Sequence, residues 1–154
     1  VILGFGPQEW VDAAGPGARL RPAELTLLGP RDEEEARSNG SVVPADFGGL
    51  HYVDANGLRH NDPRRLGAET AHRVATQGGF WVHVDVDVLD ENVFPATDYL
   101  APGGLDWPTL TQMLRPLTTA PECRGLSIAC YNPEKDPDGT YARRLVQFVD
   151  DIIA

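Results

Sequence analysis

Hydrophobic residues recur along the chain with two spacings, one typical of strands and one typical of helices. Short apolar runs bounded by turn residues predict strands at 24–28, 51–53, 80–89 and 125–131. Apolar positions at helical spacing, with capping residues before them, predict helices after Pro7, from Asp32, over 62–78, from Asp106 and over 141–153. Strands that alternate with helices favour a parallel sheet covered by helices on both faces. We therefore predict an α/β fold with three layers (α/β/α), a mainly parallel sheet and one domain over residues 1–154.

Two of these helices have a clear apolar stripe, which predicts the face that packs against the sheet. The stripes consist of Leu110, Met113, Leu114 and Leu117 in the first, and of Leu145, Phe148, Val149 and Ile152 in the second.

The strand at 80–89 carries ionisable side chains on one face and valines on the other. By alternation, His83, Asp85 and Asp87 share a face. Two carboxylates about 7 Å apart in a buried sheet would each cost several kcal/mol of desolvation. A divalent cation would offset that cost, and carboxylates with an imidazole suit ions such as Mn²⁺. The alternative is a half-exposed strand whose polar face meets water.

Composition and charge narrow the classes of partner. The formal net charge of −10 disfavours nucleic acid and anionic membranes. The chain has no apolar run of the roughly 20 residues that a membrane span needs, and two cysteines do not form a disulfide framework. We expect a reducing, cytoplasmic location. The chain begins without Met or a signal peptide, so we expect a piece of a longer protein.

Three blocks within residues 83–105 resemble a known family signature. They are His83–Asp90 (HVDVDVLD), Phe94–Thr97 (FPAT) and Pro102–Leu105 (PGGL). Together they are similar to the ureohydrolase signature of the arginase, agmatinase and formimidoylglutamase family, in which Asp-x-Asp-x-x-Asp-Pro leads into a Pro-Ala-Thr loop and a Gly-Gly-Leu helix start. The segments Leu25–Asp32 and Tyr131–Pro133 resemble further family turns. The resemblance implies an arginase-like fold, of which this chain is the C-terminal part.

The resemblance also implies a chemistry. Asp85 and Asp87 match two manganese ligands and are the implied catalytic residues, in a site expected to hold two Mn²⁺ ions when intact. In the family, a metal-bridging hydroxide cleaves a linear C–N bond of a small guanidino or formimino compound. Asp90 matches a carboxylate that organises the loop, and Thr97 is a substrate-loop candidate. Family members often form homo-oligomers.

Three departures from the family pattern bear on these expectations. The earlier ligands, a His and an Asp-x-His-x-Asp motif, should lie upstream of Val1, so the fragment alone is expected to bind metal poorly and to be inactive. Cys130 stands where arginases and agmatinases usually carry a substrate-contacting Glu. His83 replaces a common Ser, and is a structural residue, a donor that supports a metal ligand, or a ligand itself.

Two other functions fit parts of the pattern. A ureohydrolase-like domain without the upstream ligands could be a scaffold or regulatory subunit. Alternatively, Asp85 and Asp87 after an apolar strand resemble the opening motif of haloacid-dehalogenase-like phosphatases. Those enzymes need a later lysine and further acidic Mg²⁺ ligands, and Lys135 is the one lysine in the sequence.

Overall fold

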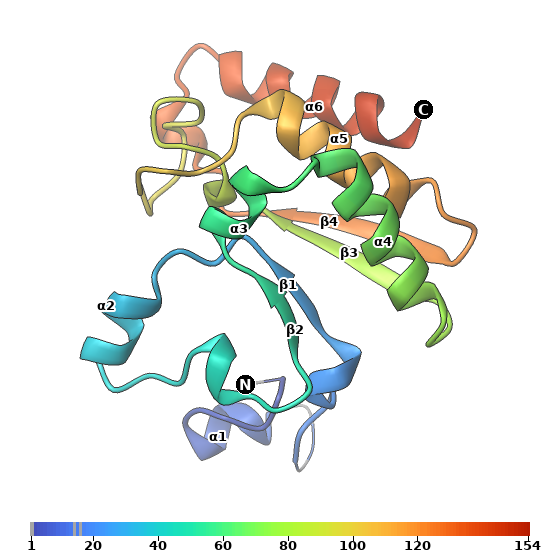
Figure 1. Ribbon diagram of the computed structural model, residues 1–154. Coiled ribbons are helices and arrows are strands. Elements are labelled where there is room, and N and C mark those ends of the chain that lie inside the picture. Colours follow the sequence, from blue (N-terminus) through green and yellow to red (C-terminus); the bar gives the residue numbers. More distant parts are fainter. Residues whose placement is uncertain (1, 14, 16) are drawn as a thin grey trace. The chain divides into compact units, whose positions relative to one another are not determined.

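The computed structural model describes residues 2–13, 15 and 17–154, which group into two compact units (Figure 1). The first unit comprises the chain up to Leu28 together with Asp32–Tyr52. The second comprises Gly29–Arg31 and Val53–Ala154. A single domain over residues 1–154 stays a prediction. Every helix in the described part of the chain is too short or too polar to cross a lipid bilayer.

The first unit is built from short elements. They are α1 (Gln8–Val11), β1 (Thr26–Leu28), α2 (Glu33–Ser38) and most of β2 (His51–Val53). β1 and β2 form a two-stranded sheet. All four elements lie where the sequence pattern predicts a helix or a strand; β1 is shorter than its predicted segment, and β2 matches it.

The second unit contains most of the regular structure. Its elements are α3 (Ala55–His60), α4 (Pro63–Ala75), β3 (Phe80–Asp85), α5 (Trp107–Thr118), β4 (Cys123–Ala129) and α6 (Thr140–Ile153). The carboxylates of Asp54, Asp62 and Asp106 accept backbone N–H groups in the first turns of α3, α4 and α5. The sequence pattern did not predict α3, because it is short and contains Asn56-Gly57, which disfavour helix.

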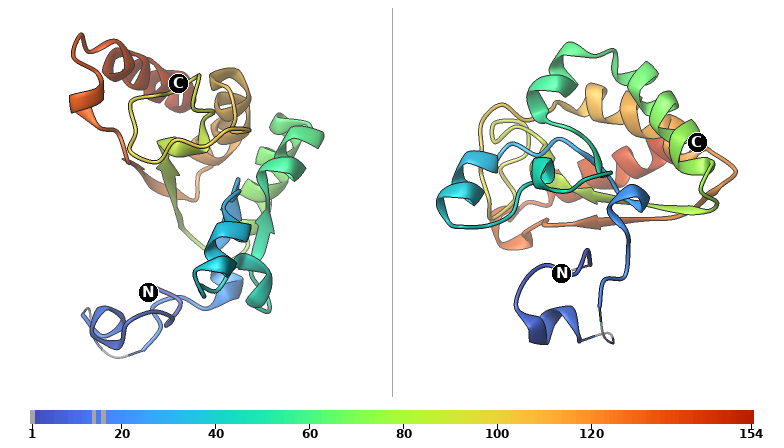
Figure 2. Two further views of the ribbon diagram at one scale, coloured as in Figure 1. Left: turned by 90° about the vertical axis from the view of Figure 1, so that its left-hand side faces the viewer. Right: turned by 60° about the horizontal axis from the view of Figure 1, so that its bottom comes forward.

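The strands β3 and β4 pair in parallel, which confirms the predicted orientation for this pair. In register, Trp81 lies opposite Gly125 and Asp85 lies opposite Ala129. Both strands therefore end at the same edge, and the loops that follow them lie together there (Figures 1 and 2).

The helices α4, α5 and α6 lie on one side of the β3–β4 pair (Figure 1). The predicted stripes of α5 and α6 are buried except for Val149, which is partly exposed. Val82 and Val84 are buried, whereas Trp81 is 60% exposed and His83 is exposed. Among the described residues, the expected helix cover is therefore found on one face of β3, and the face that carries His83 meets solvent.

The predicted strand at 80–89 is too long at its C-terminal end. β3 ends at Asp85, and Val86–Val88 form a turn of 3-10 helix. The turn forms because the carboxylate of Asp85 accepts the N–H of Asp87 at 3.2 Å, which pulls the backbone out of the extended conformation. Alternation predicted that Asp87 shares a strand face with His83 and Asp85. This prediction was wrong, because Asp87 lies in the turn and not in the strand.

The closest helix contact lies between α4 and α5. A Cβ built on Gly67 of α4 would lie 2.1 Å from the carbonyl oxygen of Met113 in α5. That separation is far below van der Waals contact, and the neighbouring atom belongs to a helix backbone, so it cannot rotate away. Glycine at this position allows the two helices to pack with their backbones nearly in contact.

We predict that Gly67→Ala lowers the free energy of unfolding by about 1 to 3 kcal/mol, because the added methyl group overpacks the α4–α5 contact. Urea unfolding followed by circular dichroism measures the change. Gly48→Ala is the matched control, since a Cβ there meets no atom within 4 Å. Equal unfolding midpoints for the two variants would contradict the packing argument.

Candidate metal centre

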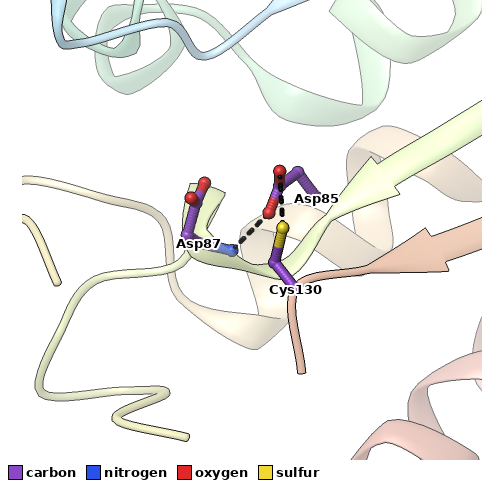
Figure 3. A group of neighbouring side chains, drawn as sticks. All are labelled: Asp85, Asp87 and Cys130. Carbon is purple, nitrogen blue, oxygen red and sulfur yellow. Dashed lines mark hydrogen bonds between the residues drawn. The ribbon is translucent and has the colours of Figure 1, made fainter. Parts of the chain in front are cut away.

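Two aspartates and a cysteine meet at the edge where β3 and β4 end. Asp85 is the last residue of β3, Asp87 lies in the following turn, and Cys130 follows β4 directly. Each residue offers a ligand atom, and these atoms all lie within 4.8 Å of one another (Figure 3). This is the edge at which open α/β sheets bind their ligands.

Hydrogen bonds arrange the three residues around the carboxylate of Asp85. One of its oxygens accepts the backbone N–H of Asp87, and the other accepts the thiol of Cys130 at 3.1 Å. Asp85 and Asp87 are half-buried, and Cys130 is exposed. The site is therefore reachable from solvent.

The surroundings of Cys130 keep its thiol protonated. The hydrogen bond to Asp85, partial burial, and the negative charges of Asp85, Asp87 and Asp98 raise its pKa to about 11. In the absence of a cation, Cys130 is therefore a neutral hydrogen-bond donor and a poor nucleophile near neutral pH.

A cavity of about 320 Å³ opens beside the cluster. Asp87 and Cys130 line it, together with Thr97, Asp98 and Asn132. Thr97 is 2% exposed, and its hydroxyl has no hydrogen-bond partner among residues 2–13, 15 and 17–154. Buried hydroxyls are normally satisfied, so an unpartnered one beside a cavity is a candidate contact for a bound molecule.

A hydrogen bond between Asp98 and Asn132 joins the loop that follows β3 to the loop that follows β4, and both residues line this cavity. The side-chain amide of Asn132 donates to Asp98 at 2.7 Å, and Lys135 pairs with the same carboxylate at 3.0 Å. These contacts, with the Asn132 bond the stronger, lower the pKa of Asp98. Lys135 also donates to the main-chain oxygen of Thr97 at 2.7 Å, which fixes the backbone beside the cavity.

Asp90 holds the loop between β3 and α5 in shape. Its carboxylate accepts the backbone and side-chain N–H groups of Asn92, both at 3.0 Å, and the backbone N–H of Gly103 at 2.8 Å. The predicted role of Asp90 as a loop organiser is consistent with this geometry.

Arg31 is a positioning residue that sequence reasoning missed. Its guanidinium donates to the main-chain carbonyls of Asp87, Leu89 and Ala101, and so joins both ends of the loop. Arg31 lies in the turn Gly29-Pro-Arg-Asp32, which resembles a turn of the family. The sequence does not indicate that its guanidinium binds main-chain carbonyls more than fifty residues away.

His83 lies outside the cluster. It is exposed, and its Nδ1 is 2.7 Å from the hydroxyl of Ser127, which also accepts the indole N–H of Trp81 at 3.0 Å. The metal-binding group found among the described residues includes Asp85, Asp87 and Cys130 without His83. The assignment of Asp85 and Asp87 as ligands, and of His83, Asp90, Thr97 and Cys130 to supporting positions, stays a prediction.

The donor atoms suit a divalent cation. Two carboxylates can neutralise its charge, and their closeness is costly without a counter-charge. The ligand atoms of the cluster all lie within 4.8 Å of one another, and opposite ligands of one ion are at most about 4.5 Å apart, so small shifts would bring all three residues within reach of one ion. The residues present therefore fit part of a metal site.

Comparison with known proteins then decides the family. The model of the arginase family matches residues 15–154. The chain belongs to the arginase family. A curated relative, the N(omega)-hydroxy-L-arginine amidinohydrolase of Streptomyces lavendulae, is 27% identical over 141 residues, which are 92% of this chain and 46% of the relative.

Solved structures share the fold. The arginase of Bacillus caldovelox superposes with a TM-score of 0.79 at 19% identity, over 99% of this chain and 50% of that one. The formimidoylglutamase of Bacillus subtilis superposes with a TM-score of 0.69 at 19% identity, over 86% of this chain and 41% of that one. This confirms the predicted arginase-like α/β fold. The chain spans about half the length of these relatives. Membership of the arginase family gives no support to the phosphatase alternative.

We predict that Asp90→Asn destabilises the loop and changes the response to acid. The N–H donors of Asn92 and Gly103 hold the pKa of Asp90 below its ordinary value of 3.8. Because the folded-state pKa is lowered, the carboxylate stabilises the fold fully above the unfolded value and loses that effect as pH falls through the folded value. The variant should unfold at lower urea concentration at pH 7, and the gap to wild type should narrow below pH 4.

Asp150→Asn, on the exposed side of α6, is the control for this experiment. It should unfold close to the wild-type midpoint at both pH values. A gap between wild type and Asp90→Asn that stayed constant from pH 7 to pH 3 would show that the charge of Asp90 plays no part.

Proposed function

We propose that the protein containing this chain is a metal-dependent amidinohydrolase that cleaves a linear C–N bond of a guanidino or formimino compound. The observation that carries the proposal is the convergence of Asp85, Asp87 and a solvent-accessible cavity at the carboxyl end of β3, in a chain of the arginase family. The names of the relatives, which include a hydroxy-arginine amidinohydrolase and a formimidoylglutamase, support this substrate class.

Asp85 and Asp87 would hold the metal, and we propose Mn²⁺, with two ions in the intact site. Divalent ions supply hydroxide near neutral pH and stabilise the negative charge that develops in the transition state. Asp85 is already oriented by the N–H of Asp87, so the carboxylate needs little rearrangement to bind a cation. The remaining ligands would come from an upstream part of the same protein, so the fragment alone is proposed to be inactive.

The other residues around the cavity would bind the substrate. Asp87 and Asp98 give the cavity a negative potential, which favours a cationic guanidinium or amidinium group over an anion. The unpartnered hydroxyl of Thr97 would hydrogen-bond to a polar atom of the substrate. The Asn132–Asp98–Lys135 contacts would hold this wall in place while the substrate binds.

We also propose that the intact protein works in the cytoplasm as a homo-oligomer on a small-molecule substrate, without nucleic acid or membrane partners. The net charge of −10 supports the last point, because such a surface repels polyanions.

We predict that Asp85→Asn and Asp87→Asn in the intact protein each lower bound manganese and reduce hydrolysis of arginine, N-hydroxy-arginine and formiminoglutamate at least about 100-fold. Even a residue that only orients a metal ligand is worth about 10- to 100-fold. Elemental analysis measures the metal, and urea or formamide release measures the activity.

Glu69→Gln is the matched control, because it removes a carboxylate from the exposed side of α4. It should retain wild-type metal content and rate. If wild type binds no metal and hydrolyses none of these compounds, the scaffold or regulatory function replaces the enzymatic one. If both aspartate variants keep full metal content, the metal site lies elsewhere.

A further inference from the structure

We propose that Cys130 is a third metal ligand, so that the site combines two carboxylates with a thiolate. The inference rests on the metal site of the proposed function and adds a ligand of a different chemical kind. It also predicts which ions the site prefers.

The distances support direct ligation. The sulfur of Cys130 lies 3.1 Å from an oxygen of Asp85, and the farthest pair of donor atoms in the cluster is within 4.8 Å. Bonds of about 2.3 Å to sulfur and about 2.0 to 2.2 Å to carboxylate oxygen place two ligands of one ion at most about 4.5 Å apart. An ion can therefore reach all three residues after shifts of a few tenths of an ångström.

The backbone turns the thiol toward the aspartates. Ala129 is the register partner of Asp85, so an extended Cys130 would point to the opposite face of the sheet. Cys130 instead has a φ of 69°, the one left-handed conformation that a residue other than glycine adopts in the described part of the chain. The left-handed turn places the thiol on the side of Asp85 (Figure 3). A left-handed backbone strains a non-glycine residue, and such strain is concentrated at functional sites.

A second observation at the same cavity points to a bound group. The hydroxyl of Thr97 is buried and unpartnered, and Thr97 lines the cavity together with Asp87 and Cys130. If the thiol of Cys130 only donated a hydrogen bond to Asp85, the cavity would contain no group that could pair with the buried hydroxyl of Thr97. An ion at the cluster, with its remaining positions taken by water or substrate, would bring a hydrogen-bonding partner into this cavity.

Ligation exchanges a proton for a metal ion. The S–H bond of Cys130 breaks, a sulfur–metal bond forms, and the proton passes to the solvent buffer, with no change of oxidation state. A thiolate is a softer ligand than a carboxylate, so it favours Zn²⁺ and Co²⁺ over Mn²⁺. We therefore expect Zn²⁺ and Co²⁺ to bind this cluster more tightly than Mn²⁺ does.

Cobalt gives a direct test, because a Co²⁺–thiolate bond adds a charge-transfer band in the near ultraviolet that carboxylate ligands do not produce. The 154-residue chain suits the test because Cys123 and Cys130 are its two cysteines. Titration of the wild-type chain with Co²⁺ into the millimolar range should produce the band. The release of about one proton per ion should accompany it.

Cys130→Ser should abolish the band and weaken Zn²⁺ binding by at least about tenfold, the lower end of the loss caused by removing a residue that only orients a ligand. Cys123→Ser is the matched control, since its thiol lies at the start of β4 near the carbonyl of Gly125, away from the cluster. This variant should keep the band and the affinity.

Co²⁺ binding without the band, or a band that persists in Cys130→Ser, would overturn the thiolate ligand and leave the proposed function standing. Absence of the band in the intact protein loaded with Co²⁺ would overturn it as well. The proposed function fails by a different result, namely an intact protein with neither metal nor hydrolase activity.

Discussion

The site depends on the closeness of two negative charges. Like charges 4.8 Å apart repel by about 1 kcal/mol in water and by about 3 kcal/mol at an effective dielectric constant of 20. The fold brings Asp85 and Asp87 together nonetheless, because a parallel strand ends there and a hydrogen bond from the N–H of Asp87 to the Asp85 carboxylate closes the turn. Hydrogen bonds to one carboxylate reduce this repulsion, and a cation would convert it into attraction. The fold therefore positions the two carboxylates so that a cation can bind between them.

Main-chain contacts hold this arrangement together with buried apolar residues of the loop, among them Leu89 and Phe94. Arg31 and Asp90 bind the loop between β3 and α5 through backbone carbonyl and N–H groups. At Gly104, a Cβ would lie 2.4 Å from the backbone nitrogen of Asp90, so the loop also closes on itself without room for a side chain. Contacts of this kind fix positions to a fraction of an ångström, which a metal site requires.

The sequence predicted the features that depend on the spacing of apolar residues. It did not predict the features that depend on one hydrogen bond or one backbone conformation. The stripes of α5 and α6 and the parallel pairing of β3 and β4 followed from spacing, because burial imposes that spacing. The predicted end of β3 was wrong. The hydrogen bond between the side chain of Asp85 and the backbone of Asp87 ends the strand, and the alternation of apolar and polar residues does not indicate such a bond. The left-handed conformation of Cys130 and the carbonyl partners of Arg31 were equally invisible, because both depend on residues distant in sequence. Family resemblance supplied Asp85 and Asp87 as a pair.

The division of the chain into units has a consequence for modularity. The residues Gly29–Arg31 belong to the second unit although first-unit segments flank them on both sides. The polypeptide therefore passes between the units at three points, and a contiguous stretch that encodes the whole second unit also includes Asp32–Tyr52 of the first. A gene segment that began at Val53 would encode every strand and helix beside the carboxylates and would omit Arg31, the cation that braces their loop. Recombination or domain transfer would preserve this site only if both segments moved together.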